Sequence, residues 1–117
     1  MRDFRKWDVY NNAKSLTILI YHLTKGFPDS EKFGLVNQLR RASVSVVANI
    51  AEGASRATDK NFRHFLTMAL GSSFEIEAQL DISLELGFIT ERNFKDASSK
   101  NEIIQKQLNA FISKLKK

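Results

Sequence analysis

The stretch that decides the fold is residues 33–55, Phe-Gly-Leu-Val-Asn-Gln-Leu-Arg-Arg-Ala-Ser-Val-Ser-Val-Val-Ala-Asn-Ile-Ala-Glu-Gly-Ala-Ser. Only three of these residues carry charge, namely Arg40, Arg41 and Glu52. Apolar residues recur every three or four positions, which is the spacing of a buried helix face. The opposite side is also poor in charge, whereas an ordinary surface helix is charged there. We therefore expect a helix that is covered on more than one side, in part by another copy of the chain.

The composition is that of a soluble globular protein. At 117 residues the chain is long enough for one domain, residues 1–117, and too short for two. Hydrophobic residues make up 43% and charged residues 26%, which argues against disorder. No apolar run approaches the roughly 20 residues that a membrane span needs, and we expect no signal peptide. Because cysteine is absent, disulfides and cysteine-bound zinc are excluded, and we expect a cytoplasmic protein.

Hydrophobic periodicity predicts four helices joined by short turns. They are expected at about residues 4–26, 30–54, 59–86 and 91–115. Asp29 or Ser30 is expected to cap the second helix, and Thr58 and Thr90 the third and fourth. Gly87 is expected to end the third helix in the left-handed conformation. Since no strand pattern competes, the sequence predicts an all-α, up-down-up-down antiparallel four-helix bundle.

The third helix carries a glycine in its middle and a second apolar stripe. Gly71 costs about 1 kcal/mol there relative to alanine, so it predicts that another backbone approaches closely. Met68, Ile82 and Leu86 belong to the second stripe, outside the main buried face. This stripe is a further indication of contact with another copy.

Patterns of catalysis and of metal binding are absent from the sequence. His22 and His64 are isolated, and neither follows the Glu-x-x-His pattern that holds metals in helical bundles. The serines lie in no nucleophile motif, and no histidine is within helical reach of Ser43, Ser45, Ser72 or Ser73. No glycine-rich phosphate loop occurs. We expect no enzyme, no cofactor and no metal site.

Polar residues line one flank of the second helix. They are Gln38, Ser45, Asn49 and Glu52, and Glu75 on the third helix belongs to the same predicted group. Because a buried polar flank must be hydrogen-bonded, we predict a structural network inside the bundle or between subunits. Arg41 falls on the same side, where Glu52 or Glu75 can neutralise it. Catalysis by these groups is the less favoured alternative.

Basic residues form the second notable group. The net charge is +5 and the isoelectric point about 9.6. The residues we expect to contact nucleic-acid phosphates are Arg40, Arg41, Arg56, Lys60 and Arg63. The last three cluster at the turn between the second and third helices, and Arg40 and Arg41 stand further back. Such contacts position a partner without reading sequence. The sequence shows no exposed aromatic platform, so base reading is not predicted. The alternative is that these basic residues only form a solvent-exposed helix end and bind no partner.

Several short strings, in this order, resemble a known bacterial family. They are Phe27-Pro28, Phe33-Gly34-Leu35, Gln38-Leu39-Arg40-Arg41-Ala42, Asn49-Ile50-Ala51-Glu52-Gly53, Phe65-Leu66 and Gly71-Ser72. The family is that of four-helix-bundle proteins encoded by intervening sequences within 23S rRNA genes. A related branch is the accessory variability determinant of diversity-generating retroelements. The resemblance covers nearly the whole chain; Asn61 departs from it, since an acidic residue is expected there.

The resemblance implies a homo-oligomeric, pentameric ring with a basic surface and no known catalysis. It also implies association with nucleic acid or with a nucleic-acid enzyme. We therefore expect a non-enzymatic ring protein that binds structured RNA, such as rRNA, or DNA through its arginines and lysines. The alternative is a protein-interaction scaffold for a partner such as a reverse transcriptase.

Overall fold

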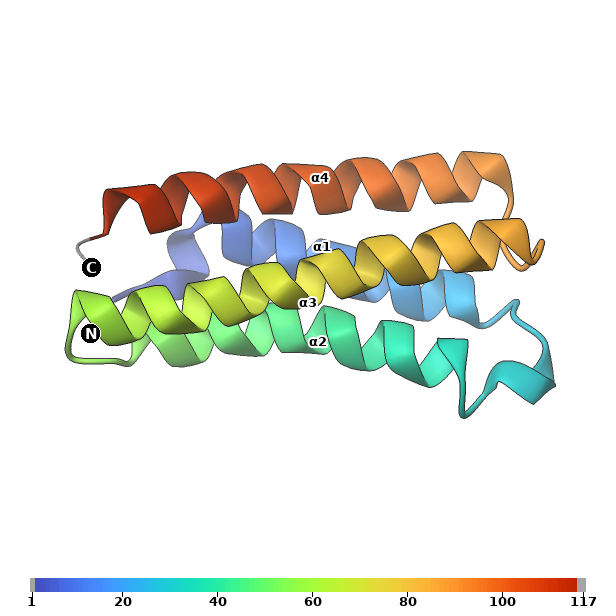
Figure 1. Ribbon diagram of the computed structural model, residues 1–117, viewed down its shortest axis with the longest axis horizontal. Coiled ribbons are helices and arrows are strands. Elements are labelled where there is room, and N and C mark those ends of the chain that lie inside the picture. Colours follow the sequence, from blue (N-terminus) through green and yellow to red (C-terminus); the bar gives the residue numbers. More distant parts are fainter. Residues whose placement is uncertain (1, 116–117) are drawn as a thin grey trace.

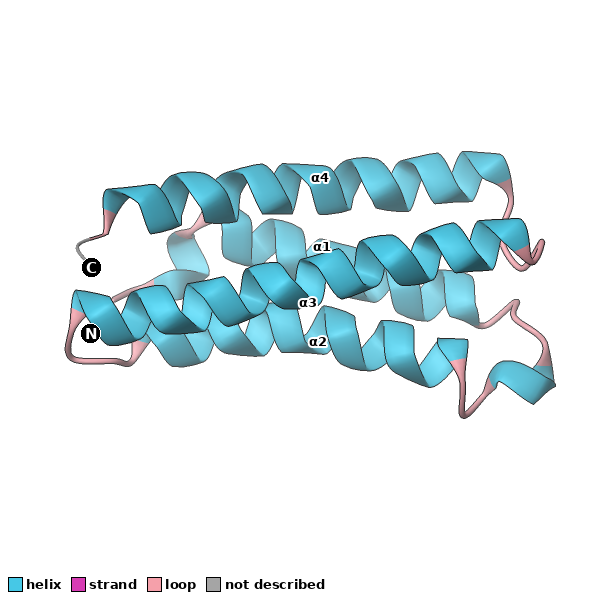
Figure 2. Cartoon of the chain, in the orientation of Figure 1, coloured by secondary structure: helices cyan, strands magenta, loops and turns pink. Residues whose placement is uncertain are grey.

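The computed structural model describes residues 2–115, which form a bundle of four long helices (Figure 1). The helices are α1 (Asp8–Thr24), α2 (Leu35–Ala54), α3 (Asp59–Glu85) and α4 (Glu91–Lys114), with 3₁₀ turns η1 (Phe4–Lys6) and η2 (Asp29–Glu31) before α1 and α2. The described residues contain no strand (Figure 2). Contacts join α1 to α2 and α4, and α3 to α2 and α4, so the helices stand in a square. This confirms the predicted all-α four-helix architecture.

The core runs along the whole length of a molecule that measures 43 × 23 × 22 Å. Each helix turns a stripe of aliphatic residues inward at steps of three and four. The fully buried residues of these four stripes include Leu16, Ile20, Leu39, Ile50, Leu66, Ile76, Leu80, Ile104 and Leu108. Because burying one such side chain contributes about 1.5–3 kcal/mol, these stripes supply the main driving force for the bundle.

The first helix begins later than predicted. Residues 4–6 form the 3₁₀ turn η1, and Trp7 is extended with φ −82° and ψ 133° before α1 starts. The extended backbone sends the indole ring inward, where it stacks on Phe62 at 5.5 Å and meets Phe111 edge-on at 4.9 Å between ring centroids. Packing of this aromatic cluster therefore overrides the helical pattern of the N-terminal residues.

The second helix also begins later than predicted, and Asp29 and Ser30 do not cap it. Both lie in the turn η2, and the helix starts after Gly34, whose φ of −104° and ψ of −114° are not helical. The carboxylate of Glu31 accepts a hydrogen bond from the amide of Leu35 at 3.2 Å. An acidic side chain from outside the helix thus satisfies one of the free amides of the first turn.

The far side of α2 is uncovered within a single chain. Val44 and Ala48 are exposed, and Phe33, in the connection before α2, is 86% exposed. A square of four helices buries only the inner part of each one, so the fold itself cannot supply a second covered side. Cover by another copy of the chain stays a prediction.

The expected close approach at Gly71 is wrong for the single chain. A Cβ atom added to Gly71 would meet nothing within 4 Å, whereas one added to Gly53 would lie 2.8 Å from the Cβ of Phe65. The same atom would lie 3.1 Å from Cδ1 of Phe62. Helices α2 and α3 therefore approach closely next to their connecting turn, and Gly53 makes that contact possible.

The ends of α3 and α4 follow the predicted local signals. The amides of Asn61 and Asn93 each donate to the cap hydroxyl three residues earlier, at 3.1 Å in both cases. Those hydroxyls belong to Thr58 and Thr90, as predicted. Gly87 has φ 74°, and the amide of the next residue bonds back to the carbonyl of residue 83, which is the Schellman arrangement.

Candidate nucleic-acid interface

The predicted cations at the α2–α3 turn gather at one end of the bundle. The turn η1 and the C-terminal end of α4 also lie at this end (Figure 1). Arg56 Nη2 forms an ion pair with Glu52 Oε1 at 2.9 Å, and its guanidinium carbon lies 4.5 Å from the ring centre of Phe65. Lys60 is exposed and Arg63 is half-buried, and within residues 2–115 neither forms an ion pair. Positive charge at this end is therefore only partly neutralised.

Arg2 belongs to the same cluster, although no sequence pattern predicts this position. Its Nη1 donates to the carbonyl of Arg56 at 2.6 Å, and its Nη2 pairs with Asp59 at 2.9 Å. Its guanidinium carbon also lies 4.4 Å from the ring centre of Phe62. Contacts across more than fifty residues hold Arg2 here, and no local pattern could have revealed them.

Arg40 and Arg41 do not join this cluster. They lie about 13 residues before the C-terminal end of α2, which corresponds to roughly 20 Å along the helix. Arg40 Nε donates to Thr24 Oγ1 at 3.0 Å, and its Nη2 donates to the carbonyl of Tyr21 at 3.3 Å. Its guanidinium carbon lies 4.6 Å from the ring centre of Tyr21. The five predicted cations therefore form two separate groups, as their positions in the sequence predicted.

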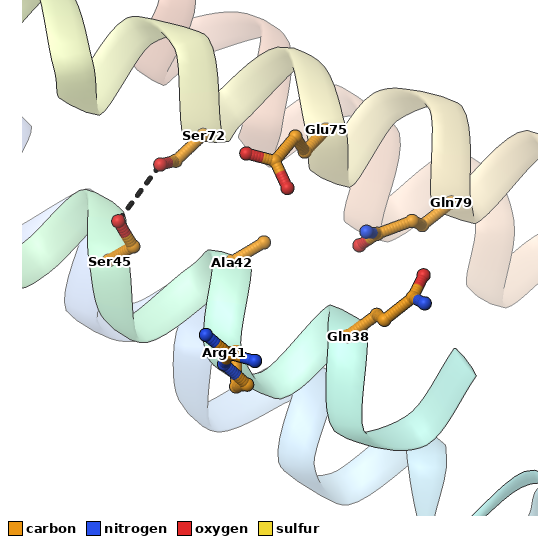
Figure 3. Close-up of a pocket in the computed structure, with 7 residues that line it drawn as sticks. All are labelled: Gln38, Arg41, Ala42, Ser45, Ser72, Glu75 and Gln79. Atoms are coloured by element: carbon orange, nitrogen blue, oxygen red, sulfur yellow. Dashed lines mark hydrogen bonds between the residues drawn. The ribbon is translucent and has the colours of Figure 1, made fainter. Parts of the chain in front are cut away.

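A polar groove of about 460 Å³ runs between α2 and α3. Its lining residues are Gln38, Arg41, Ala42, Ser45, Ser72, Glu75 and Gln79 (Figure 3). Arg41 stands on the α2 side and the Glu75 carboxylate on the α3 side (Figure 3). Within the described residues, neither forms an ion pair. Gln79 Oε1 is buried and has no hydrogen-bond donor there.

The predicted polar network is only partly assembled in the single chain. Ser45 and Ser72 share a hydrogen bond of 2.9 Å, and Asn49 Nδ2 donates to Ser45 Oγ at 3.1 Å. Glu52 turns instead to Arg56, and the described residues offer no hydrogen-bond partner to the side chains of Gln38 and Glu75. The Ser45–Ser72 hydrogen bond thus joins α2 to α3, and the side chains of Gln38 and Glu75 stay unpaired along the open groove.

A separate polar pair, not predicted, is buried between α3 and α4. Ser73 Oγ donates to Asn101 Oδ1 at 2.7 Å, and Asn101 Nδ2 donates to the carbonyl of Ser73 at 3.0 Å. Ser73 is 0% exposed and Asn101 2%. Because both atoms of the amide are satisfied in a dry core, the pair fixes the register of α4 against α3.

Two further findings concern metals and membranes. Among residues 2–115, no three histidine or acidic side chains gather closely enough to hold a metal ion. No helix in this part of the chain is long and apolar enough to cross a membrane.

Comparison with known proteins establishes the family. The model of the 23S rRNA-intervening sequence protein family matches residues 5–110. The chain belongs to this family. Among solved structures, it is similar to a protein of unknown function from the S23 ribosomal protein family of Bacteroides thetaiotaomicron VPI-5482. The TM-score is 0.81 with 22% sequence identity, over 89% of this chain and 97% of that one, which shows a shared fold. No curated protein matches.

Proposed function

We propose that the protein is a non-catalytic member of its family that binds nucleic acid by phosphate contacts at the bundle end around the α2–α3 turn. The observation that carries this proposal is the pair Lys60 and Arg63, which stand one helical turn apart without ion-pair partners in the described chain. Arg2 and Arg56 lie beside them and extend the positive surface. The family description, an rRNA-intervening sequence protein, agrees with an RNA partner.

The physical basis is the release of counterions from the nucleic acid. Each phosphate that a cation neutralises lowers the logarithm of the binding constant by about 0.9 per tenfold rise in salt on duplex DNA and about 0.7 on a single strand. Binding of this kind is independent of sequence and requires no base contact. Structured RNA and DNA are both expected to bind, with an affinity that falls steeply as salt rises.

The test is charge reversal of Lys60 and Arg63 with a matched control. The double variant Lys60→Glu/Arg63→Glu should bind a structured rRNA fragment and a DNA duplex more weakly, with a salt slope smaller by roughly 2. Arg92→Glu/Lys95→Glu makes the same charge change at the opposite end of the bundle and should retain the slope. Equal losses in both variants would mean that only net charge matters and would refute the site.

We propose in addition that the protein assembles with copies of itself through the α2–α3 face, in the five-membered ring that the resemblance implies. Arg41 and Glu75 are exposed on this face without partners in the described chain, so each can meet the opposite charge of another copy. The open space beside Gly71 leaves room for such an approach.

The test is the mass of the assembly in sedimentation. Arg41→Glu should reduce the sedimenting mass, and Arg41→Glu/Glu75→Arg should restore it. Unchanged mass in the single variant would refute this interface.

One observation favours a scaffold function as the second candidate. Phe74 is 52% exposed beside a groove of about 490 Å³ between α3 and α4 that Glu77, Asp81 and Glu102 line. An exposed aromatic ring among carboxylates suits a protein partner with a basic contact surface. An arginine-rich peptide that binds the protein but not the Asp81→Lys variant would support this function, and equal binding to both would refute it.

A further inference from the structure

Tyr21 forms, with Arg40, a fixed stacking pair on the outer face of α1 and α2. Tyr21 is 40% exposed, and the Arg40 guanidinium carbon lies 4.6 Å from the centre of its ring. Two hydrogen bonds from Arg40, to the hydroxyl of Thr24 and to the carbonyl of Tyr21, hold the guanidinium in place. Thr24 is itself fixed, since its hydroxyl donates to the carbonyl of Ile20 at 2.7 Å. The pair is therefore preorganised and does not need to be ordered by a ligand.

Two shallow depressions adjoin this pair, and Tyr21 lines both. The first, of about 590 Å³, lies on the side of Arg40 and Arg41. The second, of about 520 Å³, lies on the side of His22 and Lys25. Val44 also lines both depressions, so they form one continuous surface that crosses from α1 to α2.

The charge of this surface has a single sign. Arg40, Arg41 and Lys25 contribute cations, and among the described residues that line the two depressions none is aspartate or glutamate. The bundle end differs, because Glu52 and Asp59 pair with two of its arginines. An anion at the Tyr21 surface would meet uncompensated positive charge beside an aromatic ring and apolar side chains.

We propose that this surface binds an unpaired nucleotide of a single-stranded stretch of nucleic acid. One base would stack on the Tyr21–Arg40 pair, and a flanking phosphate would contact Lys25. Bases stack on aromatic rings and on arginine planes, and a groove of cations that follows the backbone completes a single-strand site. Bases inside a duplex are already stacked, so a duplex could use only the phosphate contacts. This inference rests on the proposed nucleic-acid binding and adds the form of its ligand.

The test compares a labelled single-stranded oligonucleotide with a duplex of the same sequence, at equal salt. Wild type should prefer the single strand, and Tyr21→Leu should weaken single-strand binding about tenfold, the loss expected for one stacked base. Tyr21→Phe keeps the ring and should bind like wild type. Duplex affinity should be the same for all three proteins. An unchanged single-strand affinity in Tyr21→Leu, or equal losses on both ligands, would overturn the inference.

Failure of this inference can be told apart from failure of the proposed function. If wild type binds neither ligand even at low salt, the proposed function fails and this inference fails with it. If Lys60→Glu/Arg63→Glu weakens binding while Tyr21→Leu does not, only the inference fails. If Tyr21→Leu lowers the mass of the assembly in light scattering and leaves binding intact, a second copy covers this face and the inference is overturned.

Discussion

Removing the hydroxyl of Ser73 should lower the free energy of unfolding by more than the net contribution of one hydrogen bond, because it leaves a buried acceptor without a donor. In the Ser73→Ala variant, Asn101 Oδ1 loses the hydrogen bond of 2.7 Å that it accepts in the core. Both residues are at most 2% exposed, so water has no access to replace the donor. The amide would keep only the bond from its Nδ2 to the carbonyl of Ser73.

The magnitude follows from the asymmetry between a lost hydrogen bond and an orphaned polar atom. A buried acceptor without a donor costs about 1–3 kcal/mol, so we expect Ser73→Ala to lower the free energy of unfolding by about 2 kcal/mol. Replacing both partners by apolar groups of similar shape can be nearly neutral. Ser73→Ala/Asn101→Leu should therefore lie within about 1 kcal/mol of wild type.

The assay is urea unfolding followed by far-ultraviolet circular dichroism, with the two single variants and the double variant measured beside wild type. Each protein is measured at two concentrations, because assembly of copies makes apparent stability depend on concentration. The double-mutant cycle isolates the coupling between positions 73 and 101, which should exceed about 1 kcal/mol. A matched control is Ser99→Ala on the exposed side of α4, which should change stability by less than about 0.5 kcal/mol.

Two outcomes would refute the reasoning. A loss below about 0.5 kcal/mol in Ser73→Ala would mean that Asn101 is not dry, because that is the size of an ordinary surface effect. A double variant as unstable as the sum of the two singles would mean that the residues contribute independently and do not form a coupled pair.

The remaining predictions concern helix geometry and use the same unfolding assay. Gly53→Ala should lower the free energy of unfolding by about 1–3 kcal/mol, because the new Cβ would lie 2.8 Å from an atom of α3. Gly71→Ala has open space around it and should raise the stability of the single bundle by up to about 1 kcal/mol. The opposite order of stabilities would contradict the close approach at the turn. Gly87→Ala should destabilise by about 1 kcal/mol because φ is 74°, and no loss would argue against the left-handed helix end. Thr58→Ala should cost about 1 kcal/mol through loss of the cap, while Thr67→Ala, on an exposed helix surface, should be neutral or slightly stabilising; equal effects would refute the cap.

Local signals predicted the turn between α3 and α4 well. Thr90 and Gly87 act through hydrogen bonds and backbone angles within a few residues, so their neighbours in sequence are also their neighbours in space. The same holds for the cap at Thr58. At the N-terminal ends of α1 and α2 the local signals failed. There Trp7 is extended into an aromatic cluster and Glu31 reaches forward to Leu35, contacts that periodicity does not encode.

In the candidate sites, too, the sequence predicted local features and missed contacts between distant residues. The sequence identified the cations and separated Arg40 and Arg41 from the cluster at the α2–α3 turn, because distance along a helix follows from residue number. It did not place Arg2, which returns to Arg56 only in the folded chain. Tyr21 falls outside the buried stripe of α1, and only the position of α2 brings Arg40 over its ring.

The sequence alone determined the number of helices, their inner faces and two of their caps, since these depend on hydrophobic periodicity and on hydrogen bonds between near neighbours. Only the tertiary structure decided where the helix backbones approach and which charges are compensated. Gly53 rather than Gly71 proved to be the point of close approach, and Ser73 proved to be the partner of Asn101. The physical reason is that these features depend on the register and spacing of neighbouring helices, which packing of the whole core sets at once.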